Sequence, residues 1–101
     1  MNSIIKDNID EIKEICIEYK VKELYLVGSA NTDKFSINSD IDLLIDFEDI
    51  SFEEYTDNFF ILQKLFKELF KREVDIITMK SLSNPFFIES IENSKQLLYA
   101  A

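Results

Sequence analysis

Residues 41–47 carry an apolar side chain at every odd position, a two-residue period that is typical of a β-strand with one buried face. The odd positions form a wholly apolar face: Ile41, Leu43, Ile45 and Phe47. Asp40, Asp42 and Asp46 fall on the opposite face, and Asp40 and Asp42 stand at the beginning of the strand. Such a strand is stable only within a sheet whose apolar face is covered by another layer.

The remaining periodicities predict which elements supply that layer. We expect an amphipathic helix over residues 3–19, a strand over 21–27, a long amphipathic helix over 52–71, a strand over 73–78, and a final helix or helix pair from Asn84-Pro85 to about residue 99. The order is α-β-β-α-β-α, which predicts an α+β (α/β) fold with a small mixed sheet of three or four strands backed by helices. We assign Phe86 and Phe87 to the core rather than to a partner interface, and Cys16 to the packed stripe of the first helix.

Length and charge narrow the functional classes. The 101 residues predict one domain spanning 1–101, and the net charge of −9 argues against direct binding of nucleic acid. The chain has no histidine and one cysteine, which excludes a zinc site, a histidine-based triad and an internal disulfide framework. With no visible signal peptide and no apolar run of membrane-spanning length, we expect a cytoplasmic protein without membrane contact.

Three segments carry residues suited to phosphate and cation chemistry. The only glycine, Gly28, follows the 21–27 strand and directly precedes Ser29. The short connection over 29–39 predicts that the first two strands are antiparallel neighbours, so Gly28 lies at the same sheet edge as Asp40 and Asp42. The long helix returns the chain, so a parallel third strand would bring Asp75 to that edge as well.

Clustered carboxylates at one edge require a bound cation or raised pKa values. Because only oxygen ligands are present, Mg²⁺ or Mn²⁺ fits best, in an arrangement of two ions that activates a hydroxyl and clamps a triphosphate. Gly28 would admit phosphate close to the backbone, and Asp75 would bind metal or accept the proton of the nucleophile. In a chain with 20 acidic residues, however, an acidic pair alone is also explained as a solvated strand edge.

The spacing of these residues resembles the signature of minimal nucleotidyltransferases (MNT) of the DNA polymerase β superfamily. It reads Gly28-Ser29, then Ser39-Asp40-Ile41-Asp42-Leu43, then Val74-Asp75-Ile76. The resemblance covers nearly the whole chain, and a stand-alone member of this size looks like the MNT antitoxins of HEPN–MNT toxin–antitoxin pairs.

This resemblance implies transfer of AMP from ATP to a hydroxyl, expected on a tyrosine, of a partner HEPN ribonuclease toxin with which the chain assembles. It implies metal ligands and catalytic groups at Asp40, Asp42 and Asp75, and nucleotide contacts at Gly28, Ser29 and Ser39.

One departure from the family pattern keeps other functions open. Many relatives carry Arg-Gly in the loop after Gly-Ser, where this chain has Thr32-Asp33. The second hypothesis is an antitoxin that neutralises its toxin by contact, with weak or no catalysis. A third is nucleotidyl transfer to a small molecule, which ranks lower because the chain has no room for a second, substrate-binding domain.

Overall fold

The fold was analysed in a computed structural model, which describes residues 3–28 and 39–101. Its elements in chain order are α1 Ser3–Asp7, α2 Ile9–Glu18, β1 Val21–Val27, β2 Ile41–Phe47, α3 Phe52–Phe70, β3 Val74–Thr78, a 3-10 turn Met79–Ser81, α4 Pro85–Ser94 and β4 Gln96–Ala100. The strands of the described residues form one mixed sheet in the order β3-β2-β1-β4. None of the described helices is long and apolar enough to cross a membrane.

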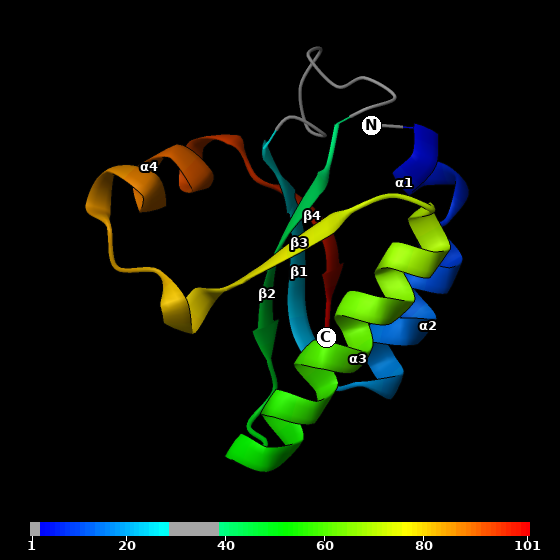
Figure 1. Ribbon diagram of the computed structural model, residues 1–101. Coiled ribbons are helices and arrows are strands. Elements are labelled where there is room, and N and C mark those ends of the chain that lie inside the picture. The colour runs from blue at the N-terminus through cyan, green and yellow to red at the C-terminus, as the bar shows by residue number, and fades with distance from the viewer. Residues whose placement is uncertain (1–2, 29–38) are drawn as a thin grey trace.

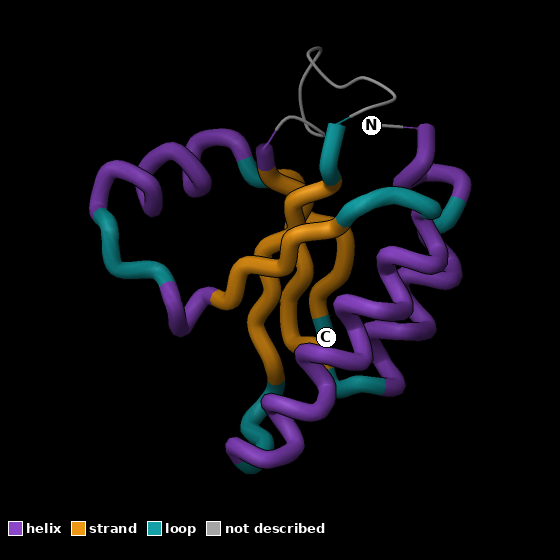
Figure 2. Tube along the Cα trace, in the orientation of Figure 1, coloured by secondary structure: helices purple, strands orange, loops and turns teal. Residues whose placement is uncertain are grey.

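The sheet has helices on both faces (Figures 1 and 2). α1, α2 and α3 cover one face, where the odd-numbered residues of β2 are buried in the main core together with Ile12 and Phe66. α4 lies on the other face, where Ile91 packs against Val27 and Leu44. The predicted apolar face of β2 is therefore confirmed and faces the three-helix layer, while Leu44 is buried on the opposite face.

Local sequence explains where the longer helices begin. The Ser51 hydroxyl accepts a hydrogen bond from the Glu54 N–H at 3.1 Å, which caps the N-terminus of α3. The Asn84 side chain accepts from the N–H groups of Phe86 and Phe87, and Pro85 takes the first position of α4. Both starts agree with the prediction from sequence.

The prediction of one helix over residues 3–19 is wrong in detail, because the helix breaks at Asn8 into α1 and α2. The Asn8 side chain donates to the Ile4 carbonyl at 2.7 Å and the Asn8 N–H to the Ile5 carbonyl at 3.1 Å. Asn8 then serves as the N-cap of α2. An asparagine that bonds the preceding turn in this way competes with helix continuation.

The prediction of a helix reaching residue 99 is also wrong. α4 ends at Ser94, and residues 96–100 form β4, which pairs antiparallel with β1 through Leu24 and Tyr99. This strand satisfies the backbone groups on the second edge of β1, and it buries Leu98 to 5% exposure.

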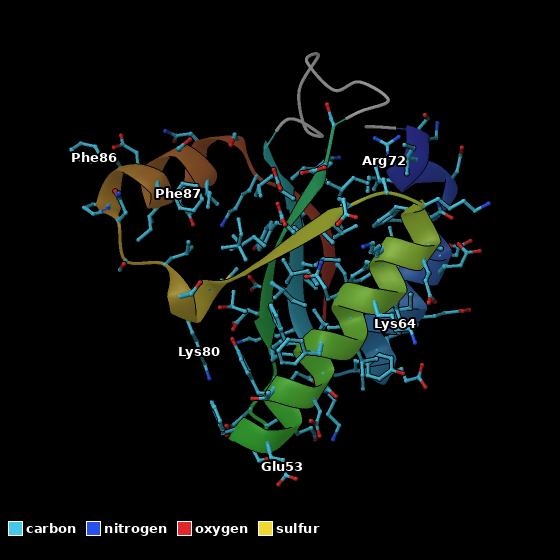
Figure 3. The ribbon with its side chains drawn as sticks, viewed as in Figure 1. Glu53, Lys64, Arg72, Lys80, Phe86 and Phe87 are labelled. Atoms are coloured by element: carbon cyan, nitrogen blue, oxygen red, sulfur yellow. The ribbon has the colours of Figure 1, made fainter. Side chains whose placement is uncertain are left out.

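The assignment of Phe86 and Phe87 to the core is wrong as well, because their side chains are 82% and 45% exposed on α4 (Figure 3). The Cys16 prediction is confirmed: the thiol is fully buried in α2, and this burial raises the pKa of Cys16 to about 12.

Candidate functional site

Three adjacent strands bring the candidate site residues to one edge of the sheet. In the antiparallel β1–β2 pair, Val27 lies opposite Asp42, so Gly28 follows directly at that edge. In the parallel β2–β3 pair, Asp42 lies opposite Asp75. Residues in register on neighbouring strands point to the same face, so both carboxylates face the side of the sheet that carries α4. The predicted neighbourhood of Asp42 and Asp75 is therefore present.

Gly28 is required by two independent features of this edge. Its φ angle is +70°, in the left-handed region that residues with a Cβ rarely adopt. A Cβ added at this position would overlap with Oδ2 of Asp42 and would lie 3.2 Å from its Cγ. The single glycine of the chain thus lets the Asp42 carboxylate lie directly against the backbone, in space that a Cβ at position 28 would need.

Asp42 is the electrostatic centre of the site. Desolvation by partial burial raises its pKa, and the neighbouring charges of Asp75 and then Asp40 raise it further. A hydrogen bond between the Asp42 and Asp75 side chains contributes in the same direction. Among the described residues, no lysine or arginine forms an ion pair with any of these three carboxylates.

Asp40 and Ser39 are held by the segment that leads into β3. Arg72 Nη1 donates to the Ser39 carbonyl at 3.0 Å, and the Ile41 N–H donates to the Glu73 carbonyl at 3.1 Å. These two bonds fix the start of β2 against the start of β3, while the Asp40 side chain stays exposed.

Arg72 was not found by sequence reasoning. It lies between the C-terminal end of α3 and the start of β3, and it belongs to no recognisable sequence motif. Its contact with Ser39 is visible only after the chain has folded.

The oxygen-only donor set suits a hard divalent cation, and the mutual repulsion of the carboxylates favours one. In the described part of the chain, no three Asp, Glu, His or Cys side chains lie close enough together to bind one metal ion. The predicted triad is thus a close pair, Asp42 with Asp75, together with an exposed Asp40. Ser29 lies outside the described residues, and so does Thr32-Asp33, the pair that differs from the family pattern.

The chain is similar in sequence to known proteins. Residues 9–98 match the family model of the nucleotidyltransferase domain. A candidate protein adenylyltransferase of Methanocaldococcus jannaschii is 33% identical over 98 residues, covering 96% of this chain and 95% of that protein.

Solved structures share the fold. A minimal nucleotidyltransferase aligns with TM-score 0.72 and 18% identity, covering 95% of both chains. A chain of a toxin–antitoxin crystallised with AMP-PNP aligns with TM-score 0.70 and 18% identity, covering 93% of this chain and 74% of that one. A chain of the tri-AMPylated Shewanella oneidensis HEPN toxin in complex with MNT antitoxin aligns with TM-score 0.64 and 16% identity, covering 95% and 72%.

Proposed function

The chain belongs to the nucleotidyltransferase domain family, and from this premise we propose that it transfers AMP from ATP to a hydroxyl group of a partner protein. The observation that carries the proposal is the convergence of Gly28, Asp42 and Asp75 from three neighbouring strands onto one edge. A backbone without Cβ beside paired carboxylates suits a triphosphate held next to a cation.

Each residue has a defined part in this reaction. Asp40, Asp42 and Asp75 would hold Mg²⁺ or Mn²⁺, which when bound activates a hydroxyl for attack and neutralises triphosphate charge. Gly28 lets the Asp42 carboxylate lie against the backbone, and we assign to this backbone, which has no Cβ, a contact with the phosphates. We assign to Ser29 and Ser39 further contacts with the nucleotide.

The bonds that change are few. The acceptor oxygen forms a bond with the α-phosphorus of ATP, and the bond from that phosphorus to the oxygen bridging to the β-phosphate breaks, so pyrophosphate leaves. Asp75, whose side chain is exposed at the edge, accepts the proton of the hydroxyl group. Asp42, which is partly buried between Val27 and Asp75, would hold the cation on the side of the phosphates.

For the acceptor we propose a tyrosine of a HEPN ribonuclease toxin. Support comes from the relative in M. jannaschii, which carries the name of a protein adenylyltransferase, and from the shared fold with a chain of the AMPylated HEPN toxin–MNT antitoxin complex. The Asp40 and Asp75 side chains are exposed in the described part of the chain, as a macromolecular acceptor would require.

The experiment combines the protein, Mg²⁺, ATP labelled at the α-phosphate and the product of the neighbouring gene. We expect label on a tyrosine of that product, located by mass spectrometry, and loss of label with the Asp42→Asn/Asp75→Asn variant. Asp46→Asn is the matched control, because Asp46 lies in the same strand at the end paired with Glu23. If the double variant still silences the toxin and the wild type adds no AMP, neutralisation by contact replaces the catalytic proposal.

A further inference from the structure

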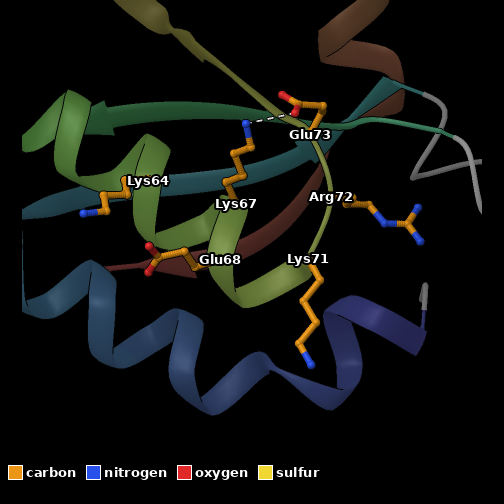
Figure 4. Close-up of a pocket in the computed structure, with 6 residues that line it drawn as sticks. All are labelled: Lys64, Lys67, Glu68, Lys71, Arg72 and Glu73. Atoms are coloured by element: carbon orange, nitrogen blue, oxygen red, sulfur yellow. Dashed lines mark ion pairs between the residues drawn. The ribbon is translucent and has the colours of Figure 1, made fainter.

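The C-terminal end of α3 and the turn after it form a groove that is basic in an otherwise acidic protein. We call it the basic groove; its lining residues are Lys64, Lys67, Glu68, Lys71, Arg72 and Glu73 (Figure 4). It gathers four of the chain's 11 cationic side chains, while the whole chain carries a net charge of −9. A local charge opposite to that of the whole molecule attracts an anionic group to one place.

Internal pairing leaves part of this charge available. Lys67 reaches across to Glu73 at 2.9 Å (Figure 4), so this pair is neutral overall. Lys64 and Lys71 are exposed, and within the described part of the chain neither forms an ion pair. Two lysines therefore face solvent with no acidic partner among the described residues.

The groove is physically joined to the candidate site. Arg72, which lines the groove, donates to the Ser39 carbonyl at 3.0 Å, and Asp40 follows directly in the chain. Glu73, also in the lining, accepts from the Ile41 N–H at 3.1 Å. A second tie holds α3 to β3, because the Gln63 side chain donates to the Val74 carbonyl. The groove lies at the α3 side of the sheet and the Asp42 and Asp75 side chains at the α4 side, so a chain bound in the groove would reach the carboxylates by passing over the edge at Asp40.

We propose that the basic groove docks an acidic segment of the protein that receives AMP, and so presents its hydroxyl group to the edge at Asp40 and Asp75. This inference rests on the proposed function for what happens after docking. A peptide segment is favoured over a nucleic acid, because a long polyanion would extend beyond six lining residues onto a surface dominated by carboxylates.

The test measures docking without ATP or metal, so that it is independent of catalysis. The probe is a fluorescein-labelled random copolymer of glutamate and tyrosine, and binding is read by fluorescence anisotropy. We expect saturable binding to the wild type that weakens with added salt and falls about tenfold with Lys64→Glu/Lys71→Glu, because repulsion replaces attraction at two positions. Lys22→Glu/Lys80→Glu carries the same charge change away from the groove and should bind almost as the wild type does.

Three results of the copolymer and RNA titrations would overturn the docking proposal. They are no saturable binding to the wild type, an equal loss in both double variants, and a labelled single-stranded RNA that binds the groove as tightly as the copolymer. Binding of an ATP analogue should be the same in Lys64→Glu/Lys71→Glu and the wild type; its loss would assign the groove to the nucleotide instead. Thermal melts of both variants confirm folding. AMP transfer is assayed separately, so failed docking and failed catalysis are told apart.

Discussion

Gly28 and Asp42 occupy opposite sides of one narrow space between β1 and β2: a Cβ at position 28 would overlap with Oδ2 of Asp42. The glycine also has a φ angle of +70°, so its backbone is unfavourable for any other residue. The two residues therefore depend on each other. The glycine permits the carboxylate to sit where it does, and the carboxylate is the reason why no side chain is tolerated there.

This relationship predicts a coupled effect on stability. Gly28→Ala should lower the free energy of unfolding by about 2 kcal/mol or more, through φ strain and overlap with Asp42. In the background of Asp42→Ala the same change should cost only about 1 kcal/mol, because the overlapping carboxyl group is gone. Urea unfolding of the four proteins measures the coupling. Equal costs in both backgrounds would show that the contact with Asp42 has no energetic effect.

The raised pKa of Asp42 predicts how the metal-free protein responds to pH. Because the folded-state pKa lies above the ordinary value of 3.8, the folded protein binds the proton more tightly than the unfolded chain does. The resulting stabilisation is complete below pH 3.8 and is lost as pH rises through the folded-state pKa. Asp42→Asn should remove this part of the pH dependence, and Mg²⁺ should reduce it in the wild type.

Thermal melts across this pH range, with and without Mg²⁺, test the assignment to Asp42. Asp46→Asn, in the same strand, controls for loss of one negative charge. A pH profile that is the same for Asp42→Asn and the wild type would contradict the account of Asp42.

The assignment of residues 96–100 to a strand predicts different effects at two adjacent leucines. Leu98 is 5% exposed and belongs to the main core, whereas Leu97 is 52% exposed. Leu98→Ala should therefore destabilise the protein by about 2–3 kcal/mol, and Leu97→Ala by less than about 1 kcal/mol. Chemical denaturation measures both. Equal losses at the two positions would be inconsistent with β4.

Lys20 offers a stabilising substitution. It links α2 to β1 with a φ angle of 61°, a conformation in which glycine is favoured. Lys20→Gly should raise the free energy of unfolding by about 0.5–1 kcal/mol, since the exposed ion pair with Glu54 at 3.5 Å contributes little. Lys22→Gly, inside β1, is the control and should destabilise the protein by about 1 kcal/mol. A lower melting temperature for Lys20→Gly would contradict this account.

The carboxylate edge could be predicted from sequence because each step depends on local rules. A two-residue period fixes the face of Asp42, and a helix between two strands makes them parallel, which brings Asp75 into register with it. Gly28 could be placed at the edge for the same reason. The close approach of the Asp42 carboxylate to Gly28 could not be foreseen, because it depends on the distance between the two strands.

Other parts depended on contacts between distant segments. Gln96–Ala100 contains Leu97 and Leu98 in succession and no clear alternation, so only its pairing with β1 makes it a strand. The bond from Arg72 to Ser39 likewise joins segments that are far apart in the chain. The exposure of Phe86 contradicts the prediction that it belongs to the core. Aromatic residues are buried more often than not, but this average does not determine the position of a single residue.

The most direct test of the central claim, a nucleotide site formed by Gly28, Asp42 and Asp75, is calorimetric titration with a non-cleavable α,β-methylene analogue of ATP. With Mg²⁺ we predict saturable binding to the wild type and to Asp46→Asn, and little binding once Mg²⁺ is chelated. Asp42→Asn/Asp75→Asn should weaken binding about a hundredfold, which corresponds to about 2.7 kcal/mol. Equal, Mg²⁺-independent affinity in the wild type and the double variant would contradict the claim.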